Sequence, residues 1–178
     1  MNVLLTGRPG IGKTTLIRKL IDTSSLSKGG FYTKEIRKEG QRVGFSLTTL
    51  DGAKSILAHL NVESPYRVGR YGVDIDNLEA IGVESIRKAI STKELIVIDE
   101  IGRMELFSKK FRDAVIEALQ TGRVLATIKK GRGNFIDVIK DRKDTRVLEV
   151  TLENRGTLLN ELVRIVTNLT NQSSQKAA

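Results

Sequence analysis

The sequence predicts an α/β protein in which a mostly parallel sheet carries helices on both faces and an inserted β-hairpin. Short apolar runs, typical of strands buried on both faces, alternate along the chain with segments whose apolar residues recur at helical spacing. Such alternation favours parallel strands joined by helical crossovers. With 178 residues, the chain is long enough for one domain, which we expect over residues 1–170. The polar stretch 171–178 is expected to fray.

The expected strands follow from the continuous apolar runs, and the expected helices follow from apolar residues at helical spacing. The clearest helix, "FSKKFRDAVIEALQTG", has an apolar stripe at helical spacing that begins at Phe111, and Gly122 supplies its stop. Buried strands are predicted over residues 2–6, 94–99, 123–128 and 145–152, and helices over 16–21, 77–91, 107–122, 134–142 and 155–169.

The segment between the first helix and residue 77 has a different character. Residues 29–52 predict two strands around the turn "KEGQ", because Val43, Phe45 and Leu47 alternate toward one face. The glycine-broken stretch "YRVGRYGVD" is expected to be extended. For "KSILAHL", over residues 54–60, we expect a short helix.

Composition limits the cellular setting and the partners. The chain has no cysteine, which excludes disulfides and thiolate metal sites, and its N-terminus lacks the basic region of a signal peptide. No stretch approaches the ~20 apolar residues of a membrane span. We therefore expect a cytoplasmic protein that does not enter a membrane. Lys and Arg total 30 against 21 acids, and the net charge of +9 would attract polyanions, which include both nucleotides and nucleic acids. Because acids are interleaved among the basic residues, we prefer a solvated charged surface to a nucleic-acid interface.

The loop after the first strand matches the phosphate-binding pattern G-x-x-x-x-G-K-[ST] without a mismatch. Glycines in such a loop let backbone N–H groups converge on phosphate oxygens, and the next helix adds its positive N-terminal end. Lys13 is expected to reach the β- and γ-phosphates, and Thr14 to hold Mg²⁺. A glycine-rich turn that does not bind phosphate would require neither the lysine nor the threonine hydroxyl. The expected nucleotide-binding residues here are Gly7, Arg8, Pro9, Gly10, Ile11, Gly12, Lys13, Thr14 and Thr15.

A second motif, "LIVIDEIGRMEL", places two acids at the end of a buried strand. Ile98 is the last apolar residue before them, and all three positions are expected at the nucleotide. Asp99 should support Mg²⁺ through a water, and Glu100 should orient and deprotonate an attacking water. The simpler interpretation is a pair of acids that starts a loop or helix. With both motifs present, Lys13 and Glu100 are the candidate catalytic residues, and Thr14 and Asp99 are the candidate metal ligands.

The same two motifs, together with "GGFYTKEIRKEGQRVGF", "VGRYGVD", "LATI" and "VTLENR", resemble those of the THEP1 nucleoside-triphosphatase family over residues 3–155. The resemblance implies a P-loop NTPase fold with a strand added between the loop strand and the acidic strand. It also implies Mg²⁺-dependent hydrolysis of several nucleoside triphosphates, ATP, GTP, CTP and UTP among them, to the diphosphate and phosphate.

Several other residues have two interpretations each. Thr127 either senses the γ-phosphate or completes a strand, and Glu105 either supports the site or is a solvated acid on a turn. Asn154, next to Arg155, either approaches the nucleotide base or caps the last helix, and we prefer the cap. One of the arginines could act as an arginine finger. The candidates for that role are Arg70, Arg103 and Arg132.

Two other functions compete with hydrolysis. A small P-loop nucleotide or nucleoside kinase would have a similar size, and "KKGRGNFIDVIKDRKD" could serve as its basic lid. An ATP-dependent nucleic-acid-binding module would account for the net charge of +9. A GTP switch is disfavoured, because no [NT]-K-x-D motif follows the third buried strand.

Overall fold

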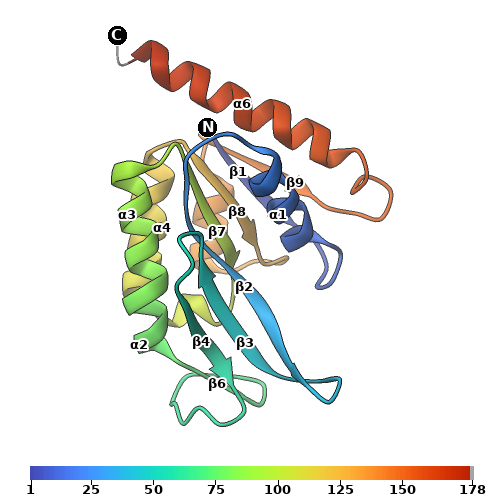
Figure 1. Cartoon of the computed structure of the whole chain (residues 1–178), viewed down its shortest axis with the longest axis vertical. Coiled ribbons are helices and arrows are strands. Elements are labelled where there is room, and N and C mark those ends of the chain that lie inside the picture. Colours follow the sequence, from blue (N-terminus) through green and yellow to red (C-terminus); the bar gives the residue numbers. More distant parts are fainter. Residues whose placement is uncertain (177–178) are drawn as a thin grey trace.

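The structure, a computed structural model, describes the backbone of residues 1–176 and the side chains of residues 1–167. Its centre is one nine-stranded sheet in the order β5-β6-β4-β3-β2-β7-β8-β1-β9 (Figure 1). β8 lies between β1 and β7, which confirms the expected added strand. The strands are β1 (Asn2–Thr6), β2 (Lys28–Lys38), β3 (Gln41–Thr49), β4 (Lys54–His59), β5 (Arg67–Val68), β6 (Tyr71–Val73), β7 (Leu95–Ile101), β8 (Val124–Ile128) and β9 (Thr145–Glu149).

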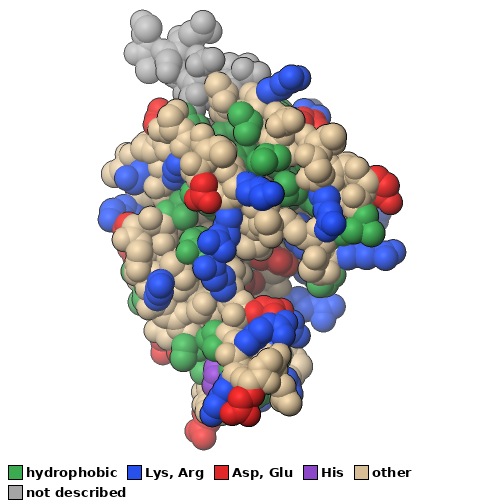
Figure 2. Space-filling model, turned by 45° about the vertical axis from the view of Figure 1, so that its right-hand side comes forward, with side chains coloured by type: hydrophobic (Ala, Val, Ile, Leu, Met, Phe, Trp, Pro, Cys, Tyr) green, Lys and Arg blue, Asp and Glu red, His purple; other side chains and the backbone are tan. Residues whose placement is uncertain are grey.

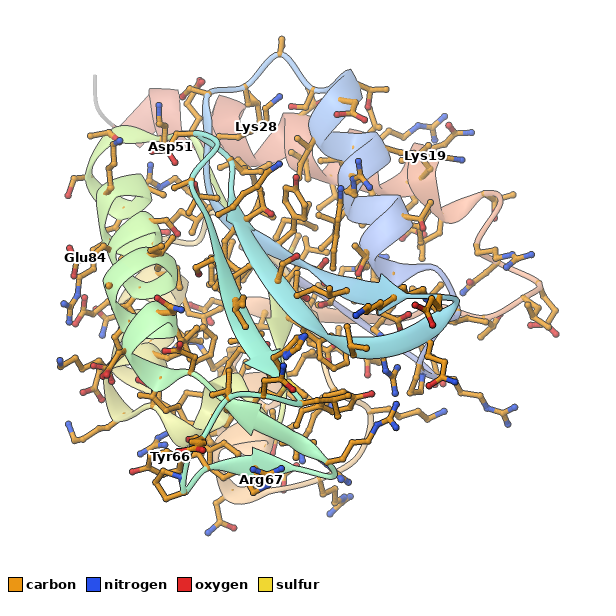
Figure 3. The ribbon with its side chains drawn as sticks, turned by 60° about the horizontal axis from the view of Figure 1, so that its bottom comes forward. Lys19, Lys28, Asp51, Tyr66, Arg67 and Glu84 are labelled. Carbon is orange, nitrogen blue, oxygen red and sulfur yellow. The ribbon has the colours of Figure 1, made fainter. Side chains whose placement is uncertain are left out.

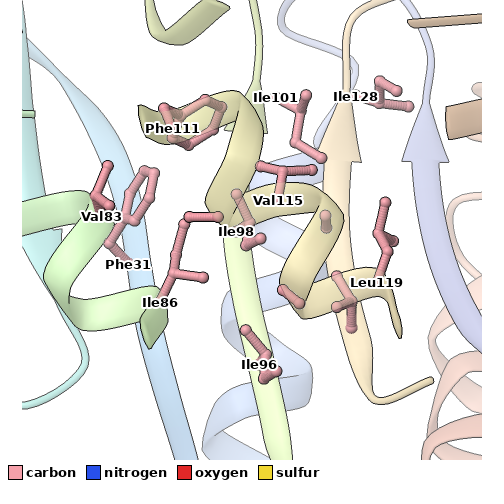
Figure 4. Close-up of a cluster of buried hydrophobic side chains, with 14 of the residues drawn as sticks. Phe31, Val83, Ile86, Ile96, Ile98, Ile101, Phe111, Val115, Leu119 and Ile128 are labelled. Carbon is pink, nitrogen blue, oxygen red and sulfur yellow. The ribbon is translucent and has the colours of Figure 1, made fainter. Parts of the chain in front are cut away.

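Helices cover both faces of the parallel half of the sheet, which comprises β2, β7, β8, β1 and β9. On one face α3 and α4 pack through Ile86, Phe111 and their neighbours (Figure 4), and on the other face α1 and α6 pack through Ile17 and Leu162. The helical elements are α1 (Lys13–Thr23), α2 (Ile75–Asn77), the π-helix η1 (Leu78–Val83), α3 (Glu84–Thr92), the 3₁₀-helix η2 (Glu105–Phe107), α4 (Lys109–Gln120), α5 (Asn134–Lys140) and α6 (Leu158–Lys176).

The strands between the helical layers are buried on both sides, as their continuous apolar sequences predict. In β7, Ile96 and Ile98 face the α3–α4 layer, whereas Leu95 and Val97 face the α1–α6 layer. All four side chains are at most 1% exposed. A parallel strand with this environment has no polar face, and this explains why its sequence does not alternate.

The prediction of a helix over residues 54–60 is wrong, because this segment forms β4 in the antiparallel half of the sheet. Leu57 packs into the main core and Ala58 into a smaller cluster with Tyr71 and Val73. An isolated helix this short is marginal in water. Strand pairing with β3 therefore decides the conformation, and the local sequence does not reveal it.

The C-terminal helix α6 is longer than expected. It begins at Leu158 and continues to Lys176, past residue 170 where the domain was expected to end. Residues 171–176, expected to fray, are thus helical in the structure, and 177–178 lie outside the described residues. Among the helices in the described part of the chain, none is long and apolar enough to cross a membrane.

The register between β2 and β7 shapes the edge of the sheet where the loops meet. β2 pairs with β7 only from Lys28 to Tyr32, and the last pair joins Tyr32 to Asp99. Beyond that point β2 continues to Lys38 with β3 alone as its partner. The hairpin therefore extends past the carboxyl end of β7. In Figure 3, β2 and β3 (cyan) pass between α1, which carries Lys19, and the loop with Tyr66 and Arg67.

Candidate active site

A cleft of about 800 Å³ lies at the carboxyl ends of the parallel strands. Its walls come from the glycine loop after β1, the hairpin beyond Tyr32, residues 100–105 after β7, and Lys129 and Lys130 after β8. Figure 2 shows a hollow in this face, with acidic side chains inside and Lys and Arg side chains around it. Ligands of open α/β folds bind at this edge. The cleft therefore brings both sequence motifs to one place.

The glycine loop is held in a conformation that only glycine adopts readily. Gly7, Gly10 and Gly12 have φ angles of 147°, 76° and 110°. A Cβ atom at Gly7 would lie 2.7 Å from the Val150 carbonyl oxygen, so this position also lacks the space for a side chain. The loop leads directly into α1 at Lys13. Backbone N–H groups and a helix N-terminus consequently share one concave surface, which is the arrangement that binds phosphate.

Lys13 lies over this loop. Its Nζ donates hydrogen bonds to the carbonyl oxygens of Gly7, at 3.2 Å, and of Arg8, at 3.4 Å. Lys13 is 8% exposed and lines the cleft with Thr14 and Thr15. Because both acceptors are neutral carbonyls, a phosphate oxygen would be a stronger partner for the ammonium group.

Asp99 is buried, with 1% of its surface exposed, at the end of β7. One carboxylate oxygen, Oδ1, accepts a hydrogen bond of 2.5 Å from the Thr127 hydroxyl. Burial raises the pKa of the Asp99 carboxyl, and the hydroxyls of Thr127 and Thr14 and the charge of Lys13 oppose this rise. The peptide bond between Asp99 and Glu100 is cis.

The other Asp99 oxygen, Oδ2, is buried without a hydrogen-bond partner among the described residues. A buried carboxylate oxygen without a partner is costly unless something else satisfies it. A divalent cation, or a water bound to one, suits this oxygen, and the Thr14 hydroxyl lies close enough to the Asp99 carboxyl to lower its pKa. The described residues contain no group of three or more His, Cys, Asp or Glu side chains that could hold a metal alone.

Glu100 is half-buried and lines the cleft beside Lys13. Burial raises the pKa of its carboxyl, the charge of Lys13 opposes the rise, and the charge of Asp99 adds to it. A carboxylate with a raised pKa is a better proton acceptor than an exposed one. Its place in the cleft and the direction of its pKa shift are those expected of a base, and this role stays a prediction.

Glu105, which sequence reasoning left open, is not a solvated acid. It is 4% exposed and lies in η2, with its Oε2 2.9 Å from the position of a Cβ atom at Gly102. The Oε1 atom of Glu100 lies 3.1 Å from the same Cβ position at Gly102. Burial raises the pKa of Glu105 to about 8, so this carboxyl is protonated at neutral pH. The cleft thus has a neutral acid close to its candidate base.

The structure places some of the remaining sequence candidates at the site and others away from it. Thr127 is fully buried and holds Asp99. The Asn154 side chain accepts from the Thr151 N–H and donates to the Glu149 carbonyl, so it braces its own loop and does not cap α6. The cap interpretation was wrong because α6 begins four residues later. Arg103 lines the cleft, but the following candidates do not: Arg8, Ile11, Arg70, Arg132, Arg155 and the core residue Ile98.

Sequence reasoning missed the wall that the hairpin contributes. Glu35, Arg42 and Phe45 line the cleft, together with Met104 from the segment after β7. Their only sequence signal was a cluster of basic residues in the hairpin, which equally fits a solvated strand edge. The register of β2 on β7 brings these side chains to the site, and such a register is a long-range property.

Comparisons with known proteins agree with this site. The sequence model of the NTPase family matches residues 2–163. The nucleoside-triphosphatase THEP1 of Thermotoga maritima is 48% identical over 167 residues, which cover 93% of this chain and 95% of that protein. The cancer-related nucleoside-triphosphatase of Homo sapiens is 40% identical over 192 residues, with 98% of both chains covered.

A solved structure shows the same fold. The crystal structure of THEP1 from Aquifex aeolicus superposes with a TM-score of 0.84 at 34% sequence identity, and it covers 93% of this chain and 99% of that one. These relatives indicate the same family as the phosphate loop, the paired acids and the sheet order. The chain therefore belongs to the NTPase family of nucleoside-triphosphate hydrolases.

Proposed function

We propose that this protein hydrolyses Mg²⁺-bound nucleoside triphosphates to the diphosphate and phosphate, with little discrimination among ATP, GTP, CTP and UTP. The observation that carries the proposal is the meeting of Lys13 and the Glu100 carboxylate in one cleft, with the unpartnered oxygen of Asp99 buried behind its wall. These are a phosphate-binding cation, a metal-supporting acid and a base, which are the parts that hydrolysis of a phosphoanhydride requires.

Each residue has a distinct role in this mechanism. The loop N–H groups and Lys13 bind the β- and γ-phosphates, and Thr14 and Asp99 would hold Mg²⁺. When bound, the metal neutralises charge that develops on the phosphate oxygens. Glu100 accepts a proton from the attacking water, whose oxygen forms the new bond to the γ-phosphorus as the bond to the β-γ bridging oxygen breaks. Thr127 keeps the Asp99 carboxylate in place through its 2.5 Å hydrogen bond.

Broad base specificity is supported by the loop after β9, the side on which a nucleotide base is expected. Asn154, the polar residue suited to read a base, has its amide and carbonyl engaged by Glu149 and Thr151. A side chain already satisfied by its own loop offers little to a base edge.

The kinase alternative relied on a basic lid over residues 129–144, and three of its cations have local partners. Arg142 pairs with Asp144 at 2.6 Å, Lys130 with Glu149 at 2.5 Å, and Lys140 donates to the carbonyls of Lys129 and Gly131. Lys140 and Arg142 do not line the cleft, whereas Lys129 and Lys130 do. Because part of the segment is engaged locally, we favour water as the acceptor.

The test is phosphate release from each of the four triphosphates, with Mg²⁺ and with the metal removed by a chelator. We expect release without any added acceptor, rates within roughly tenfold of one another, and loss of release on chelation. Lys13→Ala serves as the inactive control. Negligible release in the absence of an acceptor would leave the kinase as the better assignment.

A further inference from the structure

The lining of the cleft comes from separate parts of the chain. The phosphate loop lines one part, and Thr33, Glu35 and Arg42 of the hairpin line another, which we call the hairpin end. The hairpin reaches this position because β2 runs on after its last pair with β7, Tyr32 with Asp99. The hairpin therefore forms a wall of the same cleft that the phosphate loop lines.

The nucleotide itself does not account for this hairpin end. In the proposed function Thr14 and Asp99 would hold Mg²⁺, which would neutralise charge on the terminal phosphates. The γ-phosphate therefore faces β7, and the base leaves on the opposite side. The sheet order places the hairpin beyond β7 and places β9 on the other side of β1. From this geometry, a triphosphate in the loop leaves the hairpin end free.

The hairpin end has an apolar floor and a fixed polar pair. The floor consists of Phe45, Leu57, Val68 and Met104. The Arg42 guanidinium lies 5.2 Å from the centre of the Phe45 ring. A flat ring fits such a surface, because it can pack on apolar and aromatic side chains and stack with a guanidinium.

The polar pair is positioned before any ligand arrives. Arg42 Nη1 donates to Glu35 Oε1 at 2.8 Å, and Arg42 Nε donates to the Tyr71 hydroxyl at 3.2 Å. Glu35 also accepts two hydrogen bonds from Arg37. Glu35 neutralises only one of its two arginine partners, so the cluster keeps one positive charge, and Lys34 lines the same cleft. The Arg42–Glu35 pair offers N–H donors and carboxylate acceptors side by side, a combination that can hydrogen-bond to the edge of a heteroaromatic ring.

We propose that the hairpin end of the cleft is a second ligand site, which takes a nucleoside while a nucleoside triphosphate occupies the phosphate loop. The base packs on the apolar floor beside the stacked Arg42 and Phe45 side chains and meets Arg42 and Glu35 at its edge, and the hydroxylated sugar extends toward Glu100. A nucleoside bound there restricts the access of water to Glu100. Nucleosides should therefore lower phosphate release without competing with the triphosphate. The orientation rests on the proposed function, since it assumes the γ-phosphate at β7.

The first experiment measures binding without turnover. Adenosine, guanosine, cytidine and uridine are titrated by calorimetry into the full chain, once alone and once saturated with Mg²⁺ and a non-hydrolysable ATP analogue. We expect at least one nucleoside to bind the loaded chain, with an affinity within about threefold of that for the free chain. The proposal is overturned if none binds, or if loading abolishes binding, because the nucleoside would then occupy the triphosphate's own site.

Matched variants locate the bound nucleoside. Arg37 and Arg42 both pair with Glu35 and both are partly exposed, but only Arg42 lines the cleft. Arg42→Ala and Phe45→Leu are each expected to weaken nucleoside binding by about tenfold, and Arg37→Ala by less than about twofold. Equal losses in the two arginine variants, or no loss in either, contradict the proposed site. Calorimetry measures nucleoside binding without hydrolysis. If the protein binds nucleoside when it is loaded with the ATP analogue but does not hydrolyse triphosphates, only the proposed function is refuted.

Discussion

Three acids within seven residues of one another have three different environments, and their chemistry differs accordingly. Asp99 is buried against Thr127 with one oxygen unpartnered, Glu100 is half-buried in the cleft, and Glu105 is buried with its pKa raised to about 8. Residue type alone gives all three the same expected behaviour. Burial and hydrogen bonding separate them into a candidate metal ligand, a candidate base and a neutral acid.

Exchanging each of the first two acids for its amide should separate binding from catalysis. Glu100→Gln keeps the shape of the site and removes the base, so turnover should fall by about 10² to 10⁴ with nucleotide still bound. Asp99→Asn disturbs the metal position and should weaken binding of Mg²⁺-nucleotide more. Nucleotide affinity and single-turnover hydrolysis, measured on both variants, test this difference. If Glu100→Gln hydrolyses like the parent, another group positions the water.

The buried carboxyl of Glu105 should make stability depend on pH. Its folded pKa of about 8 lies above the ordinary value of 4.5, so the native state keeps a proton that the unfolded chain loses. The free energy of unfolding should therefore fall as pH rises from about 4.5 to 8, by at most roughly 5 kcal/mol. Glu105→Gln removes this dependence and should be more stable than the parent at pH 8.

Urea unfolding of the Glu105→Gln protein at pH 5 and pH 8 measures this effect. Exposed Glu117 on α4 supplies the control, and Glu117→Gln should follow the parent at both pH values. If the parent and Glu105→Gln lose the same free energy of unfolding between the two pH values, Glu105 does not hold its proton in the folded protein.

At the level of elements, the features predicted correctly are those that depend on a short stretch of sequence. The buried strands and the helix α4 were predicted from continuous apolar runs and from a stripe that includes Phe111 and Val115. The phosphate loop and the paired acids were predicted because each is a short contiguous motif. The strand β4 and the hairpin wall were missed, because both depend on pairing between segments far apart in the sequence.

The close approach of β2 to β7 gives a stability prediction at this scale. Gly30 has a φ angle of 102°, and a Cβ atom there would lie 2.0 Å from the Val97 carbonyl oxygen. Gly40 in the hairpin turn has a similar φ of 77° with no atom within 4 Å. Gly40→Ala should therefore lower the free energy of unfolding by about 1 kcal/mol, the backbone cost alone, and Gly30→Ala by about 3 kcal/mol or more. Equal urea midpoints for the two variants would show that β2 can move away from β7.

For the molecule as a whole, the charge of +9 is distributed, and nine of the 30 Lys and Arg side chains form ion pairs within the described residues. Ion pairs occur on separate parts of the surface, and they link elements distant in sequence. Arg146 of β9 pairs with Glu161 of α6 at 2.5 Å, and Lys88 of α3 pairs with Asp51 at 2.9 Å. A nucleic-acid interface needs cations gathered on one face or stripe. The distribution instead suits a basic protein that attracts small anions to its cleft.

The last prediction follows from this distribution and concerns the nucleic-acid alternative. A chain that engages few phosphates at once releases few counterions, so its binding to single-stranded DNA should weaken only gently with salt. We expect the slope of log affinity against log salt to have a magnitude below about 3, whereas a dedicated interface with six or more phosphate contacts gives roughly 4 or more. Turnover of ATP should stay within about twofold when the DNA is added, because no described contact links the surface cations to Glu100. Titrations at several salt concentrations, with phosphate release followed in parallel, measure both quantities. A steep slope accompanied by faster turnover would mean that the paired cations rearrange around a nucleic acid, and it would establish the module that the net charge alone suggests.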